Sequence, residues 1–274
     1  MRKTAALFLL LVLSASACAR TVSATEIITK SPTALFEKRT SKIALDMEFS
    51  GSASGQEFLF RTKGDGVQDY VDRKARIVLS VTGQGIPELP SQEIIVAGDF
   101  VYNKAPCSTG PLTGKTWVKV DQRKLAGLNP TSAASNDPTT FLEGLRGAEN
   151  IEKVGIEKVR GVSTTHYKMK INQEKALEQL TAERRAQVEG LFGAAGSGIL
   201  ADVWIDEDGL PRRYSSSFES GPESPTAFKM KMTFESYDYG TSIDVQIPPD
   251  DQVYFAEDVQ ALATICAPTS RPQG

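Results

Sequence analysis

The sequence predicts an α+β fold built on a single large antiparallel sheet, and three observations predict it. Apolar residues alternate with polar ones in many short segments, as at Ile43, Leu45 and Met47, which is the pattern of a strand with one buried face. Clusters of Gly, Asp, Asn and Pro separate consecutive segments, as turns do. Helical periodicity is confined to a few stretches, so most strands follow one another directly rather than alternating with helices.

Three short helices are expected beside the sheet. The first has Ser31 at its N-cap and Pro32 at its first helical position, where the missing N–H costs nothing. The last is either one helix or two, because Thr181 is able to cap a second one. The expected ranges are 31–41, 138–147 and 172–192.

The expected strands form two sets, one on each side of a polar loop and the second helix. Tight turns are expected at residues 64–66, 98–99 and 206–209, where Gly and Asp adjoin. The expected strands of the first set are 42–49, 57–63, 67–72, 75–82, 93–97, 100–104 and 116–121, and those of the second are 154–159, 164–171, 200–205, 212–218, 227–235 and 242–247.

The N-terminal residues resemble a bacterial lipoprotein signal. Arg2 and Lys3 precede an apolar stretch of nine residues, and small residues lead to Cys18, the expected lipidation site. Nine residues are too few to cross roughly 30 Å of hydrocarbon, so a transmembrane anchor is the weaker alternative, and simple secretion is another. The expected organisation is a signal peptide over 1–17, a lipidated cysteine and tether over 18–30, one domain over 31–266 and a flexible tail over 267–274.

The remaining cysteines, Cys107 and Cys266, are an even pair in a chain directed to an oxidising compartment. We expect a disulfide between them, and two separate thiols are the alternative. The bond would close a loop of about 160 residues, worth on the order of 5 kcal/mol in the chain-entropy model. Two cysteines and one histidine fall short of a structural zinc site, so no metal is expected.

Charge and motifs disfavour several function classes. The chain has 31 Lys and Arg against 34 Asp and Glu and no long basic run, so nucleic acid is not an expected partner. His166 is the only histidine and the sequence has no G-x-S-x-G motif, so no catalytic residue is assigned. The glycines at 193–198 lack the Lys and Ser/Thr of a phosphate loop, and residues 206–209 are typical of a hairpin turn rather than a calcium site. We expect neither an enzyme nor a cofactor.

Apolar stripes are the candidates for a ligand-binding surface. Methionine is flexible and suits partners of variable shape, and several methionines lie on these stripes. Such stripes usually form an ordinary core, but a long curved sheet with few helices leaves room for an apolar cavity, and we expect one. The expected lining residues are Met47, Phe49, Tyr167, Met169, Ile171, Leu177, Leu180, Val188, Leu191, Phe192, Phe228, Met230, Met232 and Phe234.

Several segments share their order and spacing with a known group of proteins. They are Tyr102–Lys104, Lys115–Val120, Asp137-Pro138 with Phe141, Leu142 and Leu145, Gly155–Tyr167, Val203–Asp206 with Gly209–Arg213, and Phe234–Pro249. Together they resemble the actinobacterial lipoproteins of the LppX and LprG group, which are related to the LolA type of periplasmic lipoprotein carrier. The resemblance implies a half-barrel of about eleven strands over helices, with an apolar cavity for acyl chains and no catalytic residue or metal.

These observations predict an extracytoplasmic lipoprotein, held on the membrane by Cys18, that binds the acyl chains of a lipid or lipoglycan as a carrier or receptor. The alternative is an envelope sensor that binds a membrane protein partner. An envelope transporter or regulatory protein is a candidate partner, and a monomer is expected.

Overall fold

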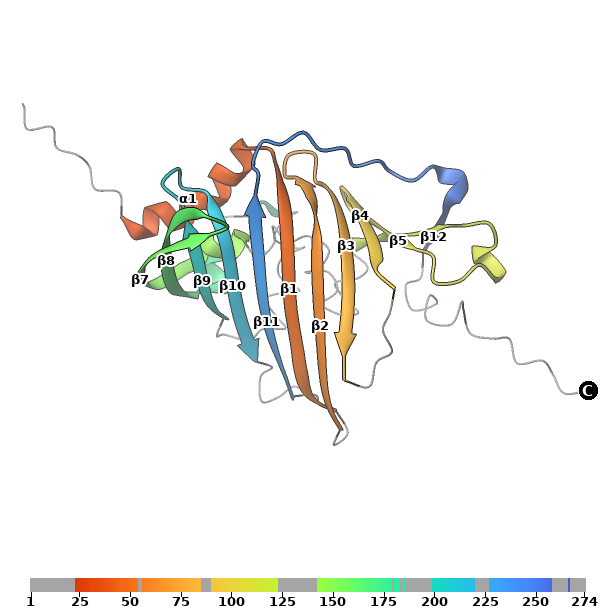
Figure 1. The fold of residues 1–274 in the computed structure, drawn as a ribbon, viewed down its shortest axis with the longest axis horizontal. Helices are drawn as coiled ribbons and strands as arrows, with labels where there is room; N and C mark the ends of the chain where they lie inside the picture. The colour runs from red at the N-terminus through yellow and green to blue at the C-terminus, as the bar shows by residue number, and fades with distance from the viewer. Residues whose placement is uncertain are drawn as a thin grey trace, which may run out of the picture.

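One continuous, curved sheet of twelve strands dominates the described part of the computed structural model (Figure 1). The structure describes residues 23–53, 56–84, 90–122, 142–178, 180–182, 185, 199–219, 227–257 and 266. The strands are β1 (Thr40–Ala53), β2 (Gln56–Asp69), β3 (Lys74–Gly83), β4 (Gln92–Ala97), β5 (Phe100–Lys104), β6 (Trp117–Asp121), β7 (Ala148–Val159), β8 (Val162–Ile171), β9 (Ile199–Ile205), β10 (Pro211–Glu219), β11 (Ala227–Tyr237) and β12 (Val253–Ala256).

The strand order is β12-β6-β5-β4-β3-β2-β1-β11-β10-β9-β8-β7, so the sheet is open, with β12 and β7 at its edges. Every neighbouring pair is antiparallel except β12 with β6, which is parallel. The predicted α+β class with one large antiparallel sheet is confirmed. The pairing of β1 with β11 joins the two sequence halves at the centre of the sheet.

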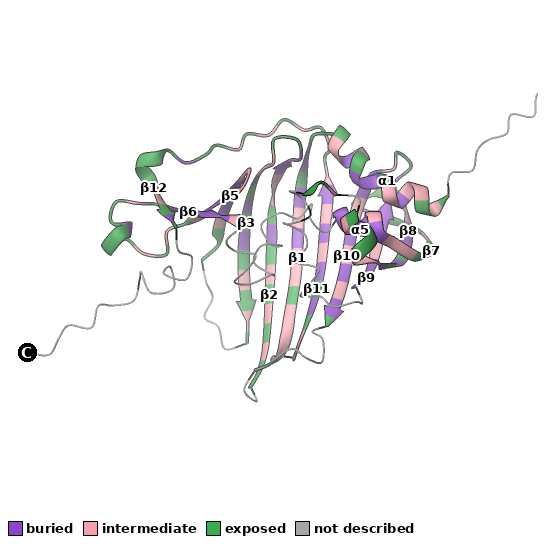
Figure 2. Ribbon diagram, turned by 180° about the vertical axis from the view of Figure 1, so that it is seen from behind, coloured by how far each residue is buried: buried purple, intermediate pink, exposed green. Residues whose placement is uncertain are grey.

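Helices lie on one side of the sheet, which we call the inner face; the opposite side is the outer face (Figure 2). The helical elements are α1 (Ala24–Glu37), α5 (Gln173–Glu178) and the 3₁₀ turns η1 (Gly110–Leu112), η2 (Gly144–Gly147) and η3 (Asp250–Gln252). Helix α1 packs against η2, β7 and β10, and α5 packs against η2. These helical contacts therefore gather at the β7–β10 end of the sheet. None of the described helices is long and apolar enough to span a membrane.

Helix α1 begins earlier than the sequence predicts. Its N-cap is Ser23, whose hydroxyl accepts a hydrogen bond from the Glu26 backbone N–H at 3.1 Å, and Pro32 lies inside the helix. The proline leaves the Ile28 carbonyl without its helical donor, and the Ser31 hydroxyl donates to that carbonyl at 2.8 Å instead. Since Ile28 is fully buried, residues 24–30 belong to the domain rather than to a tether.

The predicted turn at residues 64–66 is wrong, because β2 runs through it as one strand. A Cβ on Gly64 would lie 2.4 Å from a Leu79 methyl carbon, and a Cβ on Gly66 would lie 2.2 Å from the Arg76 carbonyl oxygen. The two glycines therefore allow β3 to approach β2 closely, which is a second common reason for glycine within a strand.

The predicted strand at residues 242–247 is also wrong. Residues 241–249 form no strand, and Val245 packs by its side chain against Ile95, Tyr102 and Trp117 on the outer face. Its alternating pattern reflects that one packed side rather than a hydrogen-bonded ladder. The chain then forms β12, which the sequence analysis did not predict. The predicted turns at residues 98–99 and 206–209 are confirmed, with Gly98 and Gly209 at positive φ.

The main core lies between the inner face and the helices. Ile28 and Leu35 of α1 belong to it together with Ile43 of β1 and Phe234 of β11. Tyr214 of β10 is buried in this core, and burial raises the pKa of its hydroxyl to about 12. A smaller core lies near the other end of the sheet, where a disulfide joins Cys107 to Cys266 with an S–S distance of 2.05 Å.

Candidate functional site

The register of the central strands brings the predicted apolar stripes together on the inner face. Met47 of β1 lies opposite Met232 of β11, and Phe49 lies opposite Met230. Leu45 lies opposite Phe234. Three strands further along, Tyr167, Met169 and Ile171 of β8 belong to the same core cluster. Residues predicted separately from different segments thus share one surface.

Burial divides these residues into two groups. One group is sealed in the core: Tyr167, Met169, Ile171, Met230, Met232 and Phe234. The other is half-buried and packs against that core: Met47, Phe49, Leu177, Leu180 and Phe228. The residues of the first group are therefore ordinary core residues, which is the alternative to ligand contact. The residues of the second group keep exposed apolar surface that a ligand could cover. Val188, Leu191, Phe192 and Cys18 lie outside the described residues.

Five phenylalanines form a row across β10, β11, β1 and β2, which we call the aromatic row: Phe218, Phe228, Phe49, Phe58 and Phe60. The ring centroids of Phe49 and Phe228 are 5.0 Å apart, and those of Phe49 and Phe58 are 5.4 Å apart in a stacked arrangement. Phe218 is buried, and the other four rings are half-buried.

Sequence reasoning missed three members of the aromatic row. Phe58 and Phe60 alternate within the predicted strand 57–63, and that alternation is the signal that could have found them. The sequence could not show which residues lie beside these rings, because Phe60 is brought opposite Phe49 only by the register of β1 with β2. Phe218 likewise meets Phe228 only through the β10–β11 pairing.

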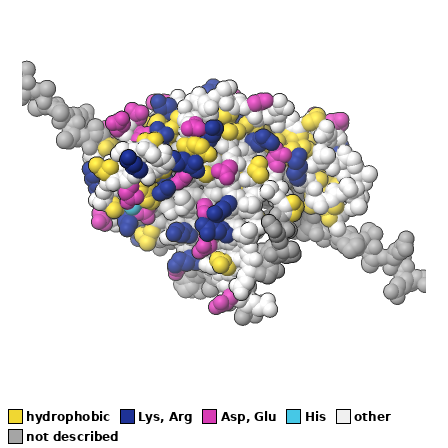
Figure 3. Space-filling model, in the orientation of Figure 1, with side chains coloured by type: hydrophobic (Ala, Val, Ile, Leu, Met, Phe, Trp, Pro, Cys, Tyr) yellow, Lys and Arg dark blue, Asp and Glu magenta, His cyan; other side chains and the backbone are white. Residues whose placement is uncertain are grey.

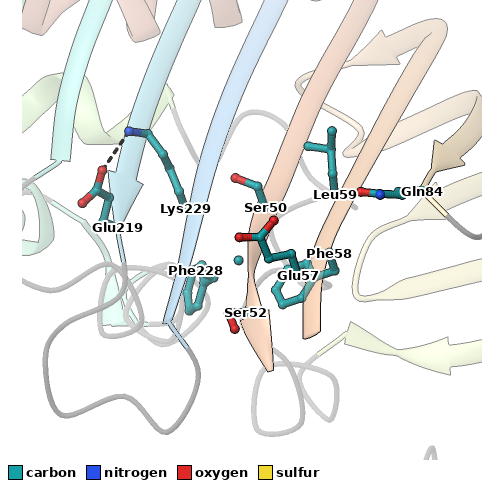
Figure 4. A pocket seen from close by; sticks show the side chains of 10 residues that line it. Ser50, Ser52, Glu57, Phe58, Leu59, Gln84, Glu219, Phe228 and Lys229 are labelled. Carbon is teal, nitrogen blue, oxygen red and sulfur yellow. Dashed lines mark hydrogen bonds and ion pairs between the residues drawn. The ribbon is translucent and has the colours of Figure 1, made fainter. Parts of the chain in front are cut away.

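A shallow pocket of about 650 Å³ lies beside the aromatic row, at one end of β1, β2, β10 and β11 (Figure 4). Its size falls within the roughly 300–1,000 Å³ typical of small-molecule sites. Phe58 and Phe228 of the row line it, together with polar side chains. The lining residues are Ser50, Gly51, Ser52, Glu57, Phe58, Leu59, Gln84, Glu219, Phe228 and Lys229.

His166, the only histidine of the sequence and not an expected catalytic residue, lies on the outer face. Its Nδ1 is 2.9 Å from a Glu157 carboxylate oxygen and its Nε2 is 2.7 Å from an Asp202 oxygen. The ring stacks on Trp204, with centroids 4.1 Å apart. The Trp204 N–H donates to Glu157 at 2.8 Å, and this bond, with that of His166, lowers the pKa of the Glu157 carboxyl. Both ring nitrogens are thus engaged in contacts that join β7, β8 and β9.

The outer face mixes both signs of charge, with Lys and Arg gathered over the central strands beside Asp and Glu (Figure 3). Many of these charges are paired: Arg61 binds Asp46 through two hydrogen bonds of 2.9 and 2.7 Å, and Arg76 donates to Glu93 at 2.6 Å. Within the described part of the chain, no cluster of three or more His, Cys, Asp or Glu residues is arranged to hold a metal ion.

No family model matches the chain. A protein of Streptomyces griseus, described as an uncharacterized 31.2 kDa protein in the rplA-rplJ intergenic region, is 27% identical over 171 residues, which are 58% of this chain and 54% of that protein. The chain thus spans about half the length of the curated relative that it matches.

Two solved lipoprotein structures are similar to this chain. LppX of Mycobacterium tuberculosis has 16% identity and a TM-score of 0.47, covering 81% of this chain and 97% of that one. LprF of Mycobacterium bovis has 11% identity and a TM-score of 0.47, covering 82% of this chain and 96% of that one. LppX belongs to the group that the sequence segments resemble.

Proposed function

We propose that this protein binds the acyl chains of a lipid or lipoglycan on the inner face of its sheet, as a membrane-anchored carrier or receptor in the cell envelope rather than as an enzyme. The aromatic row is the observation that carries the proposal. Four of its five rings are half-buried, although rings of this size are among the side chains that gain most from full burial. The surface they retain is suited to an apolar guest.

The composition of this surface favours flexible chains over a rigid planar ligand. Met47 is half-buried and lies opposite Thr62 of β2. It is two residues before Phe49 in β1 and therefore on the same face of the sheet. A methionine beside stacked rings adapts to a chain that bends. Burial of apolar area at about 25 cal/mol per Å² would supply the binding free energy.

The N-terminal sequence supports the proposed location. Acylation of Cys18 would hold the domain at the extracytoplasmic face of the membrane, where lipid ligands are available, and two or more acyl chains are needed for lasting attachment. Helix α1 starts at Ala24, so only a short segment would separate the anchor from the folded domain.

Chain binding to the aromatic row is tested with the full chain carrying Cys18→Ala, delipidated and titrated with dodecanoate in a calorimeter. We expect saturable binding that Phe49→Ala and Phe228→Ala each weaken about tenfold. Loss of about 60 Å² of contact at about 25 cal/mol per Å² is worth about 1.5 kcal/mol, close to one decade in affinity.

The matched control is Phe255→Ala, which removes a half-exposed ring of β12 that is not in the aromatic row. Its affinity should equal that of the parent, and circular dichroism should show that all three variants are folded. Saturable binding that the two row variants leave unchanged would contradict the proposed site. An absence of lipid binding, together with one stoichiometric protein partner in cell crosslinking, would favour the envelope sensor instead.

A further inference from the structure

The pocket beside the aromatic row carries a second kind of chemistry. Its outer-face side presents two hydroxyls, from Ser50 and Ser52, the carboxylate of Glu57 and the amide of Gln84 (Figure 4). These groups together donate and accept hydrogen bonds in several directions, which is what a ligand rich in hydroxyl groups requires. A purely apolar ligand would displace water from these groups without replacing its hydrogen bonds.

The charge of the pocket disfavours an anionic ligand. Lys229, the one cation among the described residues that line the pocket, binds Glu219 with an Nζ–Oε1 distance of 2.8 Å. Glu57 has no ion-pair partner among the described residues, so the pocket carries one uncompensated negative charge. A phosphate, sulfate or carboxylate group would meet this carboxylate at close range, whereas a hydroxyl group can donate to it.

Gly51 lies where the polar side chains of the pocket adjoin the rings of the inner face. It lies opposite Phe228 of β11 on one side and opposite Phe58 of β2 on the other. Glycine adds no side chain between the two rings, and all three residues line the pocket. Because Gly51 is paired with a strand on each side, a single ligand reaches both the aromatic row and the polar groups by passing around this end of the sheet.

We propose that this pocket binds an uncharged, hydroxyl-rich headgroup, a saccharide or polyol, of the lipid whose chains lie on the aromatic row. The inference rests on the proposed function, because it places the headgroup beside the chain site. The serines, Glu57 and Gln84 bind the hydroxyl groups, and Phe58 and Phe228 contact the apolar side of the headgroup.

The test compares three probes that share a twelve-carbon chain, each below its micelle concentration: dodecyl maltoside, dodecylphosphocholine and dodecanoate. The full chain carrying Cys18→Ala is titrated with each by calorimetry, and maltose alone is the fourth probe. We expect dodecyl maltoside to bind most tightly, by about tenfold. Gln84→Ala, at an exposed position, should remove most of this preference and leave dodecanoate affinity within about twofold. Glu57→Ala, also at an exposed position, should remove most of the preference and strengthen dodecanoate binding, because the carboxylate that repels the anion is gone.

The matched control is Glu48→Ala, which removes an exposed carboxylate from the same outer face of β1 without touching the pocket. It should keep the preference for dodecyl maltoside. Equal affinity for the three probes, or preference for the phosphocholine or carboxylate headgroup, would overturn the headgroup inference but leave chain binding in place. Maltose binding as tightly as dodecyl maltoside would overturn the link to a lipid. Failure of all three probes to bind would instead reject the proposed function itself.

Discussion

Glycine at two positions of β2 sets how the sheet packs at its centre. Gly64 and Gly66 lie opposite Leu45 and Ile43 of β1, and a Cβ at either would meet atoms of β3. At Gly64 the nearest atom is a Leu79 methyl carbon, which can rotate away. At Gly66 it is the carbonyl oxygen of Arg76, which cannot move without its strand. Gly66 is therefore the more demanding position.

Gly66→Ala should lower the free energy of unfolding by roughly 2–4 kcal/mol, because the new methyl group forces β2 and β3 apart. Denaturant unfolding monitored by circular dichroism measures the loss. Gly155→Ala in β7 is the control, since nothing lies within 4 Å of a Cβ there and the φ of Gly155 suits any residue. Equal stability of the two variants would show that β3 does not approach Gly66 as closely as described.

Strand β7 is attached to the sheet in part by polar side chains. It is an edge strand, and its register with β8 shifts twice, between Glu149 and Glu152 and between Lys153 and Gly155. Such irregularities and exposed lysines protect an edge from pairing with other chains, but they also weaken its own ladder. Bonds from Glu157 to His166 and Trp204 compensate on the outer face.

His166→Ala should loosen β7 without affecting lipid binding, because His166 lies on the face opposite the aromatic row. Two carboxylates lose a partner and Trp204 loses its stacked ring, which should cost about 1–3 kcal/mol. Faster amide exchange confined to β7 and β8, at unchanged dodecanoate affinity, is the expected result. Lys168→Ala, at an exposed position of β8, should leave exchange as in the parent. Abolition of a hydrolytic activity by His166→Ala would show that the protein is an enzyme.

At the scale of the whole molecule, the helices, the aromatic row and the disulfide lie at different parts of one sheet. Helices α1 and α5 close the inner face near β7–β10, and the aromatic row crosses the central strands. The disulfide lies toward the opposite edge, where Cys107 and Cys266 pack against the small core that contains Leu112 and Ala256. We therefore expect loss of the disulfide to change stability without changing binding at the aromatic row.

Cys107→Ser with Cys266→Ser should destabilise the fold and leave binding intact. The bond joins residues 159 apart, and the chain-entropy model assigns about 5 kcal/mol to a loop of that length. We expect a lower melting temperature with dodecanoate affinity within about twofold of the parent below that temperature. Weaker dodecanoate binding by a folded double variant would mean that the disulfide edge also shapes the lipid site.

The sequence by itself determined local structure, because period, turn residues and cysteine number are local properties. It predicted most strands, the hairpin at Asp206, the partner of Cys107 and the apolar stripe from Phe228 to Phe234. The turn predicted around Gly66 was wrong, because glycine is as typical of a close approach between strands as of a turn. The strand predicted around Val245 was also wrong, because a segment that packs on one side alternates in polarity as a strand does.

Only the tertiary structure decided which apolar residues are sealed and which keep a surface. Met230 and Phe49 are equivalent in sequence pattern and lie opposite each other, yet Met230 is 4% exposed and Phe49 is half-buried. The pocket likewise assembles residues from four strands that the sequence separates widely. Burial depends on strand register and on where helices cover a curved sheet, and these are long-range properties that no short stretch of sequence contains.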